Sequence, residues 1–445
     1  MSGIQTNKKQ LNSLLLTFLA LAWPTVLEQL LSTILQYVDT AMVGHLGTRA
    51  TTTVSLSTTY TWLIGGAIYG LGIGFLSYIS RAVGAMDETK IHNAAGQAVL
   101  MTIISGILLT VAVLIIAPLM PVWMGAEEDV RHDASLYFII ISLPLIFRAS
   151  ATILGSAIRA TGNTKTPMII NVTLSLSNVV FNALFIYVLD MGAIGAGIAT
   201  AISYSIGGIL MFIAFIKNAT LKFTWKNVKP NKMVLKPCLI IAFPVIITQI
   251  ISSLGYIVAT SFVSAMTTTI YAAHSIAITA EQLFYIPGYG MQTATSTLIG
   301  NSVGEQNPTK TNQIIRISMI CVVILMLITG TALFFGAPLI MQIFTNDAEV
   351  IEIGSTLLRI VAFTEPVFGG SAVMTGIYAG LGNTKPPLFI ELFSRWGIRI
   401  LGSYITIKLL HMGINEIWYC MIADNITKAI LLAIGLVILI RKIKR

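Results

Sequence analysis

The sequence predicts an all-α polytopic membrane protein with twelve transmembrane helices in two six-helix lobes. Hydrophobic residues make up 55% of the 445 residues and charged residues only 10%, whereas a soluble domain carries roughly a quarter charged residues. The apolar runs are about 20 to 28 residues long, which is enough for a helix to cross a hydrocarbon core. In addition, the chain repeats itself at an offset of 220 residues.

The repeat runs without a gap from about residue 14 to about residue 400. Pro24 returns as Pro244, and the loop Gly-Asn-Thr-Lys that begins at Gly162 returns at Gly382. Because six spans per copy give both copies the same orientation, we expect the lobes to be related by a pseudo-two-fold axis along the membrane normal. Twinned lobes of this kind usually enclose a substrate path and rock against each other.

Each predicted span is an apolar run bounded by polar or turn-forming residues. In order, the runs cover residues 14–42, 53–80, 93–120, 132–158, 167–189, 192–216, 236–263, 271–299, 313–340, 352–379, 387–410 and 416–440. Strands of a transmembrane barrel alternate apolar and polar residues over about ten positions, and no run here alternates in that way. The spans are therefore predicted to be helices, which satisfy their backbone hydrogen bonds within one segment.

Charge is distributed unequally around these spans. Residues 1–13 and 441–445 are predicted tails, 14–216 and 236–440 are the two lobes, and 217–235 is a basic connector. The tails and the connector are rich in Lys and Arg, whereas a loop on the opposite side is acidic. This positive-inside pattern predicts a multi-pass protein of the cytoplasmic membrane with both termini in the cytoplasm. It also accounts for the net charge of +9 without a nucleic-acid partner.

Asp39 is an isolated carboxylate in the first predicted span. No basic residue lies within a helical turn or two of it, and its counterpart in the second copy is Ala259. A carboxylate inside a membrane costs several kcal/mol and indicates function by default. A need common to both lobes cannot explain a charged residue that only one lobe carries.

The fifth and sixth predicted spans of the same lobe carry neutral polar side chains. Asn178 and Asn182 are four residues apart and share one helical face, and their counterparts are an Ile and a Gly. Thr200 lies in a small-residue run of the sixth span. With Asp39 they form an all-oxygen set suited to Na⁺, or to a carboxyl that exchanges H⁺. The alternative is that these side chains only tie the spans together by hydrogen bonds.

A second site for a proton or for substrate is expected at four further residues. Gln36 and Tyr37 lie in the first span, just before Asp39, and Glu281 and Glu365 lie in the eighth and tenth spans. The counterparts of both glutamates are uncharged. The alternative role of the glutamates is ion pairing with an arginine, for which the candidates are Arg148, Arg395 and Arg399.

Two further carboxylates have a basic residue four positions later. Glu391 precedes Arg395, and Asp424 precedes Lys428. Side chains four residues apart are neighbours on a helix surface. Each is therefore predicted to form an ion pair within its own helix.

Several short motifs resemble those of one transporter family. Pro24 is followed fifteen residues later by Asp39, flanked by Val and Thr, and Asn178 and Asn182 resemble a pair of carboxamides in the family's fifth span. Thr200 falls where the family has a threonine in its site. Over nearly the whole chain, the sequence is similar to the multidrug and toxic compound extrusion (MATE) family. The resemblance implies a V-shaped pair of lobes that alternates between outward and inward states.

Three positions depart from the family pattern. Ser252 replaces a glutamate that two branches carry in the seventh span, Phe368 replaces an aspartate of one branch, and Leu35 replaces a tyrosine of another. A cation site in the C-terminal lobe like those of other members is therefore in doubt. The branch, and with it the choice between Na⁺ and H⁺, stays open.

The resemblance implies a secondary active antiporter that exports cationic, amphipathic drugs in exchange for H⁺ or Na⁺, with no other cofactor. The protein is expected to be a monomer in the lipid bilayer. It is also expected to be a transporter and not an enzyme. The alternatives are a lipid-linked oligosaccharide flippase of the related superfamily, an intramembrane enzyme and a channel. A flippase predicts a cationic cavity, and an enzyme predicts a catalytic partner for His274, which has none nearby in sequence.

Overall fold

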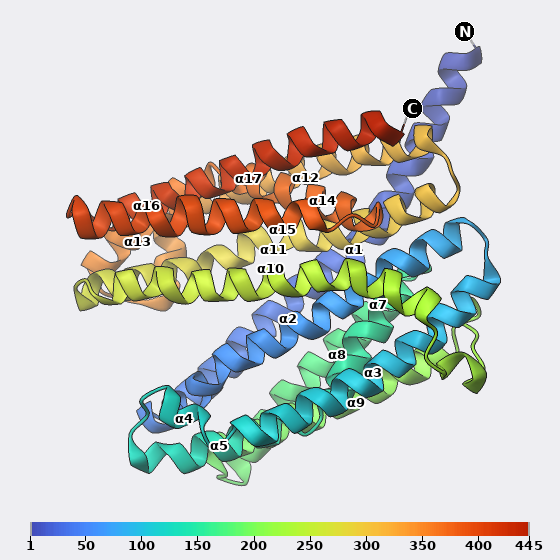
Figure 1. Ribbon diagram of the computed structural model, residues 1–445. Coiled ribbons are helices and arrows are strands. Elements are labelled where there is room, and N and C mark those ends of the chain that lie inside the picture. The colour runs from blue at the N-terminus through green and yellow to red at the C-terminus, as the bar shows by residue number, and fades with distance from the viewer. Residues whose placement is uncertain (1, 444–445) are drawn as a thin grey trace. The chain divides into compact units, whose positions relative to one another are not determined.

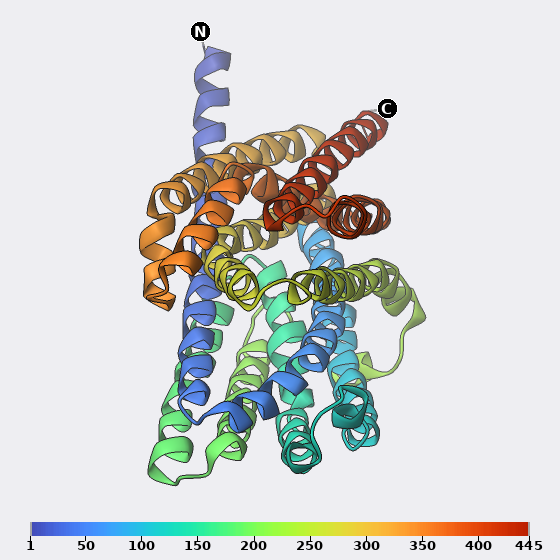
Figure 2. The same cartoon turned by 90° about the vertical axis from the view of Figure 1, so that its left-hand side faces the viewer.

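The computed structural model describes residues 2–443, and it describes side-chain surroundings from Leu11 to Arg441. The end of the predicted C-terminal tail, at residues 444–445, lies outside the described residues. Figures 1 and 2 show helices joined by short connections, and the described part of the chain contains no strand. The first helix, α1, already begins at Ser2 and therefore includes most of the predicted N-terminal tail.

The chain forms two compact units, which differ from the predicted lobes in how they share two helices. Unit 2 comprises residues 31–246, and unit 1 comprises residues 1–30 and 247–445. The boundaries fall inside α1 (Ser2–Gly44) and α10 (Lys232–Ser264), so each of these helices contributes to both units. The lobe boundaries at 14–216 and 236–440 stay a prediction about the order of the spans.

Unit 2 contains the last part of α1, the first part of α10 and the elements between them. These are α2 (Thr48–Gly84), α3 (Glu88–Ile116), α4 (Met120–Trp123), α5 (Glu128–Ser142), α6 (Leu145–Ala149), η1 (Ser150–Leu154), α7 (Gly155–Ala160), α8 (Lys165–Asn182), η2 (Ala183–Val188), α9 (Gly192–Ile216) and η3 (Trp225–Val228). The segments η1 and η2 are π-helical and η3 is a 3₁₀ turn.

Unit 1 contains the first part of α1, the last part of α10 and everything that follows. Its elements are α11 (Thr268–Gly304), α12 (Pro308–Phe344), α13 (Ala348–Ala362), α14 (Glu365–Gly380), α15 (Lys385–Leu392), η4 (Phe393–Ile400), α16 (Leu401–Tyr404), η5 (Ile405–Leu409) and α17 (Ile414–Ile443). The segments η4 and η5 are π-helical.

The helix boundaries confirm the sequence repeat. α2 and α11 begin and end at positions 220 residues apart, and so do α5 and α13. Both copies break one span at the same place: α5 meets the next helical stretch at 49° and α13 meets α14 at 52°. Pro144 lies at the first break and Pro366 just after the second, where a proline cannot donate a backbone hydrogen bond.

The structure places helices at all twelve predicted spans, although two of these spans are less apolar than the other ten. Eight helices are long and apolar enough to cross a membrane, and each of the two bent pairs would add one more. The remaining two spans are α11 and the stretch from α15 to η5. They carry the buried Glu281 and Glu391, respectively. Polar side chains inside a unit, rather than toward lipid, explain why these two spans are less apolar.

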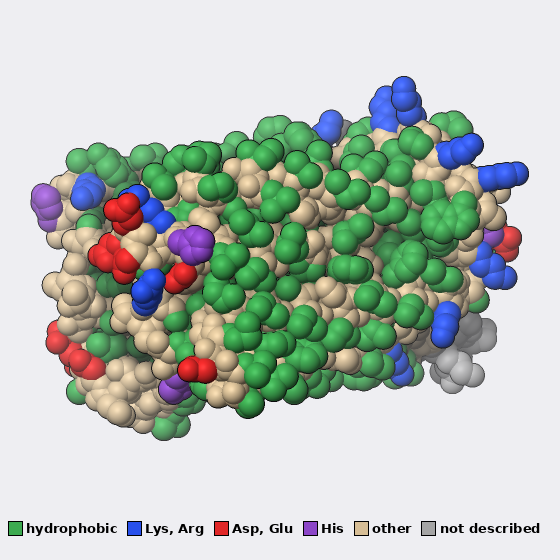
Figure 3. Space-filling model, turned by 90° about the horizontal axis from the view of Figure 1, so that it is seen from below, with side chains coloured by type: hydrophobic (Ala, Val, Ile, Leu, Met, Phe, Trp, Pro, Cys, Tyr) green, Lys and Arg blue, Asp and Glu red, His purple; other side chains and the backbone are tan. Residues whose placement is uncertain are grey.

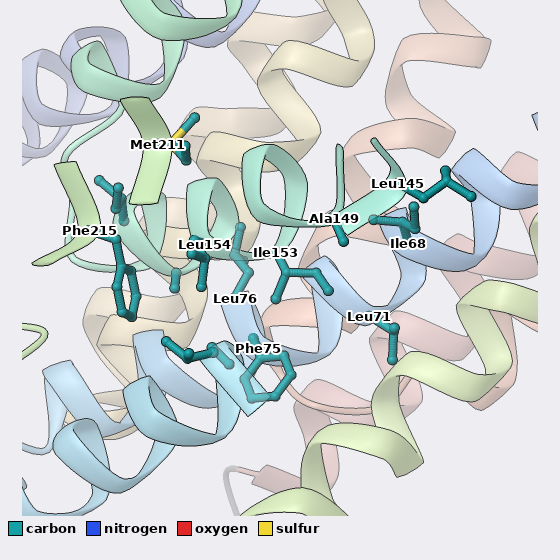
Figure 4. Close-up of a cluster of buried hydrophobic side chains, with 14 of the residues drawn as sticks. Ile68, Leu71, Phe75, Leu76, Leu145, Ala149, Ile153, Leu154, Met211 and Phe215 are labelled. Atoms are coloured by element: carbon teal, nitrogen blue, oxygen red, sulfur yellow. The ribbon is translucent and has the colours of Figure 1, made fainter. Parts of the chain in front are cut away.

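Each unit has its own hydrophobic core. In unit 2, side chains of α2 such as Phe75 and Leu76 pack with Leu145 and Ile153 of the broken span and with Met211 of α9 (Figure 4). Unit 1 has two clusters, one of which includes Phe18 from the first part of α1. Many large apolar side chains remain exposed; on the face shown in Figure 3 they cover a broad area, and the charged side chains gather near its two ends. This distribution suits a surface solvated by lipid.

Candidate functional site

The structure brings together the four side chains that the sequence predicted as a coupling site. Asn182 on α8 donates a hydrogen bond from Nδ2 to the Oδ1 carboxylate oxygen of Asp39 on α1. Asn178 donates from its own Nδ2 to Oγ1 of Thr200 on α9, at 3.1 Å. The Nδ2 atom of Asn182 also lies 3.4 Å from Oδ1 of Asn178. One polar cluster therefore connects three helices of unit 2.

Local sequence explains why these side chains meet. Asn178 and Asn182 are one helical turn apart on α8, so their carboxamides project from one face. α8 packs along α9, and glycine permits this close approach: a Cβ on Gly207 would lie 2.3 Å from the side chain of Leu174. The π-helical segment η2 begins at Ala183, directly after Asn182. Such π turns occur frequently at functional sites.

The cluster is partly shielded and contains one formal charge. Asn182 is fully buried, whereas the other three side chains are half-buried. In the part of the chain that the structure describes, no basic side chain forms an ion pair with Asp39. The Oδ1 atom of Asn182 is buried and has no hydrogen-bond donor among the described residues. The cluster therefore holds a carboxylate without a counter-charge and a buried oxygen without a donor.

The donor set fits a monovalent cation or a proton. Every atom of the cluster that can accept a hydrogen bond or bind a cation is an oxygen of a carboxylate, a carboxamide or a hydroxyl. Such oxygens suit hard cations, and a single carboxylate balances one positive charge. Within the described residues, no group of three or more His, Cys, Asp or Glu side chains could hold a metal ion. The oxygen atoms of the cluster could therefore hold a hard monovalent cation or exchange a proton.

Two further side chains of unit 2, Tyr137 and Arg148, differ in how they relate to this cluster. Tyr137 on α5 is buried and close enough to Asp39 to interact with it electrostatically. Arg148, a candidate partner for a buried glutamate, instead lies over the ring of Tyr204 at 5.3 Å and donates to the backbone oxygen of Thr61 at 3.3 Å. The contacts shown for Arg148 are therefore made to residues of unit 2, and neither of them is with a glutamate.

The four residues of the predicted second site are divided between the units. Gln36 is exposed and Tyr37 is half-buried, and both belong to the α1 segment of unit 2. Glu281 on α11 and Glu365 on α14 are buried in unit 1, where they interact electrostatically with each other. Both carboxylate oxygens of Glu365 are buried and lack a hydrogen-bond partner among the described residues. The structure therefore brings together the two glutamates.

A separate network of ion pairs fills part of unit 1. Arg395 lies 2.9 Å from Glu391, which confirms the predicted pair within the helix. The predicted pair between Asp424 and Lys428 is wrong, because Lys428 instead lies 3.1 Å from Glu391 and Asp424 lies 3.5 Å from Arg395. α17 packs against α15 and η4, so Asp424 and Lys428 both find their partners across this helix interface.

Sequence reasoning did not identify Ser252 as part of this network. Ser252 on α10 donates a hydrogen bond of 2.9 Å to Oε1 of Glu391. It occupies the position where some family members carry a glutamate, so the carboxylate beside it comes from α15. That carboxylate has two basic partners, Arg395 and Lys428. One signal in the sequence could have indicated this network. Glu391 and Lys428 carry opposite charges in two spans of the second copy, and their counterparts in the first copy are uncharged.

Comparisons with known proteins agree with this architecture. The family model described as MatE matches the chain twice, at residues 24–184 and 244–405. A "Probable multidrug resistance protein NorM" of Thermotoga maritima is 28% identical over 92% of this chain and 89% of the relative. "Multidrug export protein MepA" of Staphylococcus haemolyticus is 22% identical over 91% of this chain and 89% of the relative.

Two solved structures show how closely the fold is shared. An outward-facing multidrug resistance MATE family transporter of the MOP superfamily superposes with a TM-score of 0.92, at 22% identity and with 96% of each chain covered. A MOP superfamily transporter from Pyrococcus furiosus, described as having a binding pocket of reverse polarity that suggests a different function, superposes with a TM-score of 0.89 at the same identity and coverage. Both share the fold of this chain.

The helices, their repeat and these structures define a polytopic membrane protein with the twelve-helix, two-lobe fold. The two matches of the family model begin at Pro24 and Pro244, the counterparts with which the sequence repeat was recognised, and together they cover most of the chain. The chain belongs to the MatE family.

Proposed function

We propose that this protein is a secondary active antiporter that exports cationic, amphipathic compounds in exchange for Na⁺ or H⁺. The observation that carries the proposal is the cluster around Asp39, with its single carboxylate and neutral oxygen ligands. The names of the relatives, which are multidrug resistance and multidrug export proteins, support efflux of several drugs. They also agree with the prediction that the chain is not an enzyme.

The carboxamide of Asn182 connects ion binding to a local rearrangement. With Asp39 ionised, Asn182 donates through Nδ2 and its Oδ1 has no donor. A protonated Asp39 becomes a donor, and a bound Na⁺ needs oxygen ligands. Either event favours rotation of the carboxamide so that its Oδ1 faces Asp39. Because Asn182 directly precedes the π-helical η2, this rotation acts at a point where the helix geometry changes.

Coupling requires that the ion favour one state of the transporter. An ion shifts a conformational equilibrium only by its difference in affinity for the two states. We infer that the ion enters from outside, binds Asp39 and favours the state that has released the drug. A membrane potential adds about 2.3 kcal/mol per charge per 100 mV to this inward movement. In this orientation both termini lie in the cytoplasm, and the transporter acts as a monomer in the cell membrane.

Glu281 and Glu365 form the second site of this proposal. A charged, buried carboxylate without a hydrogen-bond donor is costly, and Glu365 lies beside a second carboxylate instead of a cation. A proton or a cationic substrate would relieve that cost. The charged groups facing the pair are Arg399, which interacts electrostatically with Glu281, and the ion-pair network behind Arg399. Gln36 and Tyr37, which lie on α1 in unit 2, are proposed separately as residues that contact substrate.

The flippase alternative is the strongest rival because its fold is the same. For the Pyrococcus furiosus transporter, which shares this fold, the reverse polarity of the binding pocket is described as suggesting a different function. A site for a pyrophosphate needs basic side chains without acidic partners. Here Arg395 and Lys428 each lie beside a carboxylate. Drug efflux without flipping of a labelled lipid would exclude the flippase.

The enzyme and channel alternatives have less support. His274, the histidine inside a span, accepts a hydrogen bond of 3.1 Å from Nε1 of Trp418, and not one from a serine or cysteine. This contact is typical of a histidine that packs in a core. A channel would let substrate run down its gradient without a fixed exchange ratio. Measured counterflow of drug against the coupling ion would exclude it.

Dye efflux from energised vesicles tests the proposal. Wild type, Asp39→Asn and the control Asp133→Asn, whose carboxylate forms a surface ion pair with Arg49, are compared under a Na⁺ gradient and separately under a H⁺ gradient. We expect efflux in wild type and in the control, and background efflux in Asp39→Asn. Undiminished efflux in that variant would disprove the coupling role of Asp39. The gradient that drives efflux identifies the ion.

A further inference from the structure

The segment that joins α9 to α10 is held against unit 2 and does not hang free. We call residues 217–236 the connector strap. The side chain of Gln97 on α3 is fully buried beneath it. Its Nε2 donates to the backbone oxygens of Asn227, at 2.6 Å, and Lys229, at 2.7 Å. Its Oε1 accepts a hydrogen bond of 3.1 Å from the backbone N–H of Asn231, so one side chain fixes three points of the strap.

Neighbouring contacts keep the strap close to α3. The side chain of Asn227 donates to Oδ1 of Asn93 at 2.6 Å. A Cβ on Gly96 would lie 2.5 Å from backbone and side-chain atoms of Asn227, so only a glycine allows this approach. Asn227 and Thr224 also form a capping box around the 3₁₀ turn η3. The strap is therefore ordered before it meets any partner.

This ordered strap presents an uncompensated positive charge. Six lysines lie in it and all six are exposed: Lys217, Lys222, Lys226, Lys229, Lys232 and Lys236. The sequence contains no Asp or Glu between Asp190 and Glu281. Within the described residues none of the six lysines forms an ion pair. Elsewhere, by contrast, Lys90 lies 2.8 Å from Asp87 and Lys310 lies 2.7 Å from Glu305.

The strap also joins two candidate membrane spans and exposes apolar side chains. α9 ends at Ile216 and α10 begins at Lys232, and both helices are long and apolar enough to cross a membrane. Trp225 is 73% exposed and Met233 is 81% exposed. Trp225 packs edge-on against Phe223, with the ring centroids 6.2 Å apart. Tryptophan is enriched at membrane interfaces, where its ring meets the lipid head groups.

We propose that the connector strap is a preformed binding surface for the head groups of anionic phospholipids. Clustered lysines beside a transmembrane helix attract anionic lipids, with each lysine adding roughly fivefold to the affinity. The ordered backbone reduces the entropy lost on binding. A nucleic acid would also meet the lysines, but it does not explain the exposed Trp225 and Met233 at the end of two spans. The lipid surface accounts for both features.

Quenching of Trp225 by brominated lipids tests this proposal. The full chain is reconstituted in phosphatidylcholine nanodiscs that contain either brominated phosphatidylglycerol or brominated phosphatidylcholine at equal mole fraction. The difference in fluorescence between wild type and Trp225→Phe isolates the signal of Trp225. We expect stronger quenching by the anionic lipid, and loss of this preference at high salt. The salt titration needs no lysine substitution, so it tests the proposal even where a variant with several lysines replaced fails to fold.

Two multiple variants separate the strap from general charge. The preference for anionic lipid should fall several-fold in Lys222→Ala/Lys226→Ala/Lys229→Ala, since three head-group contacts are removed. It should persist in the control Lys90→Ala/Lys310→Ala, whose lysines already have acidic partners. Equal quenching by both lipids in wild type, or an equal loss in both variants, would overturn the proposal. Reversal of the quenching by added inorganic phosphate, but not by chloride at the same ionic strength, would mean that the strap binds free phosphate, which also overturns it.

Discussion

The two copies of the repeat use the same helix contacts for different chemistry. In unit 2, Asn182 and Thr200 belong to the hydrogen-bonded cluster around Asp39. Their counterparts in unit 1 are Gly402 and Cys420, and a Cβ on that glycine would lie 3.0 Å from the sulfur of that cysteine. The helices thus approach each other in both copies, but in unit 1 small and apolar side chains fill the position.

The charges of unit 1 lie elsewhere along the same span. Glu391 and Arg395 precede the counterpart of Asn178, which is Ile398, by seven and three residues. η5 repeats the π turn of η2, whereas the longer π segment η4 occurs where the first copy continues α8. Arg395 lies in η4 and has acidic partners on two helices. The comparison indicates that unpaired charge marks the proposed coupling site and that paired charge marks a structural network.

The largest effect is expected from Glu391→Gln. The substitution leaves the buried Lys428 and the half-buried Arg395 without their shared carboxylate, and breaking a buried ion pair in this way costs about 3 kcal/mol. Asp39→Asn removes no ion pair and should leave stability nearly unchanged. Thermal unfolding of the purified variants in one detergent measures both. If Asp39→Asn were destabilised as strongly as Glu391→Gln, the cluster around Asp39 would be a structural tie and the contrast would fail.

Asn182→Leu should impair ion binding more than folding. The variant fills the buried space but removes the donor to Asp39 and the Oδ1 oxygen. We expect the ion concentration for half-maximal efflux to rise roughly tenfold, which corresponds to about 1.4 kcal/mol. Dye efflux at a series of Na⁺ concentrations and pH values measures this shift. Asn182→Gln, which keeps the carboxamide, serves as the control, and an unchanged half-maximal concentration in Asn182→Leu would contradict the assignment.

Gly402→Ala tests whether unit 1 has space for a larger side chain at the counterpart of Asn182. Its new methyl group would meet the sulfur of Cys420, and overpacking of this kind costs about 1 to 2 kcal/mol. Efflux per folded molecule should not change. The control is Gly44→Ala, because a Cβ on Gly44 has no neighbour within 4 Å. Equal unfolding temperatures for the two variants would show that the space at Gly402 is not restricted.

The smallest effect is expected from Thr200→Val. The substitution removes one hydrogen bond to Asn178, which contributes about 1 kcal/mol. The half-maximal ion concentration should therefore rise about fivefold, while Thr200→Ser should retain the wild-type value. The same efflux titration provides the measurement. A Thr200→Ser variant as impaired as Thr200→Val would show that the methyl group, and not the hydroxyl, matters.

Much of the fold and of the candidate site could be predicted because the relevant signals are local. Apolar runs long enough to span a bilayer located the helices, and the offset of 220 residues recurs in the boundaries of α2 and α11. Asp39, Asn178 and Asn182 stood out because their counterparts are not polar in the same way. Four-residue spacing placed the two carboxamides on one face, and the hydrogen bonds agree.

The predictions that failed or were missed concern the choice of partner between helices. Spacing suggested that Lys428 would pair with Asp424, but rotation and packing of α17 bring it to Glu391. Ser252 joins the same carboxylate from a helix more than a hundred residues earlier in the chain. A four-residue rule considers only one helix surface. It does not take account of a partner on another helix. A buried charge needs a partner because of its desolvation cost, whichever helix supplies that partner.

The sequence by itself determined the number, order and internal repeat of the helices, together with the set of residues that only one copy carries. These properties follow from hydrophobicity, chain length and residue identity at fixed offsets. The tertiary structure alone decided that each unit takes part of α1 and of α10, that Lys428 meets Glu391 and that Gln97 fixes the connector strap. The physical reason is that such choices depend on how helices rotate and approach one another when buried polar groups must all find partners.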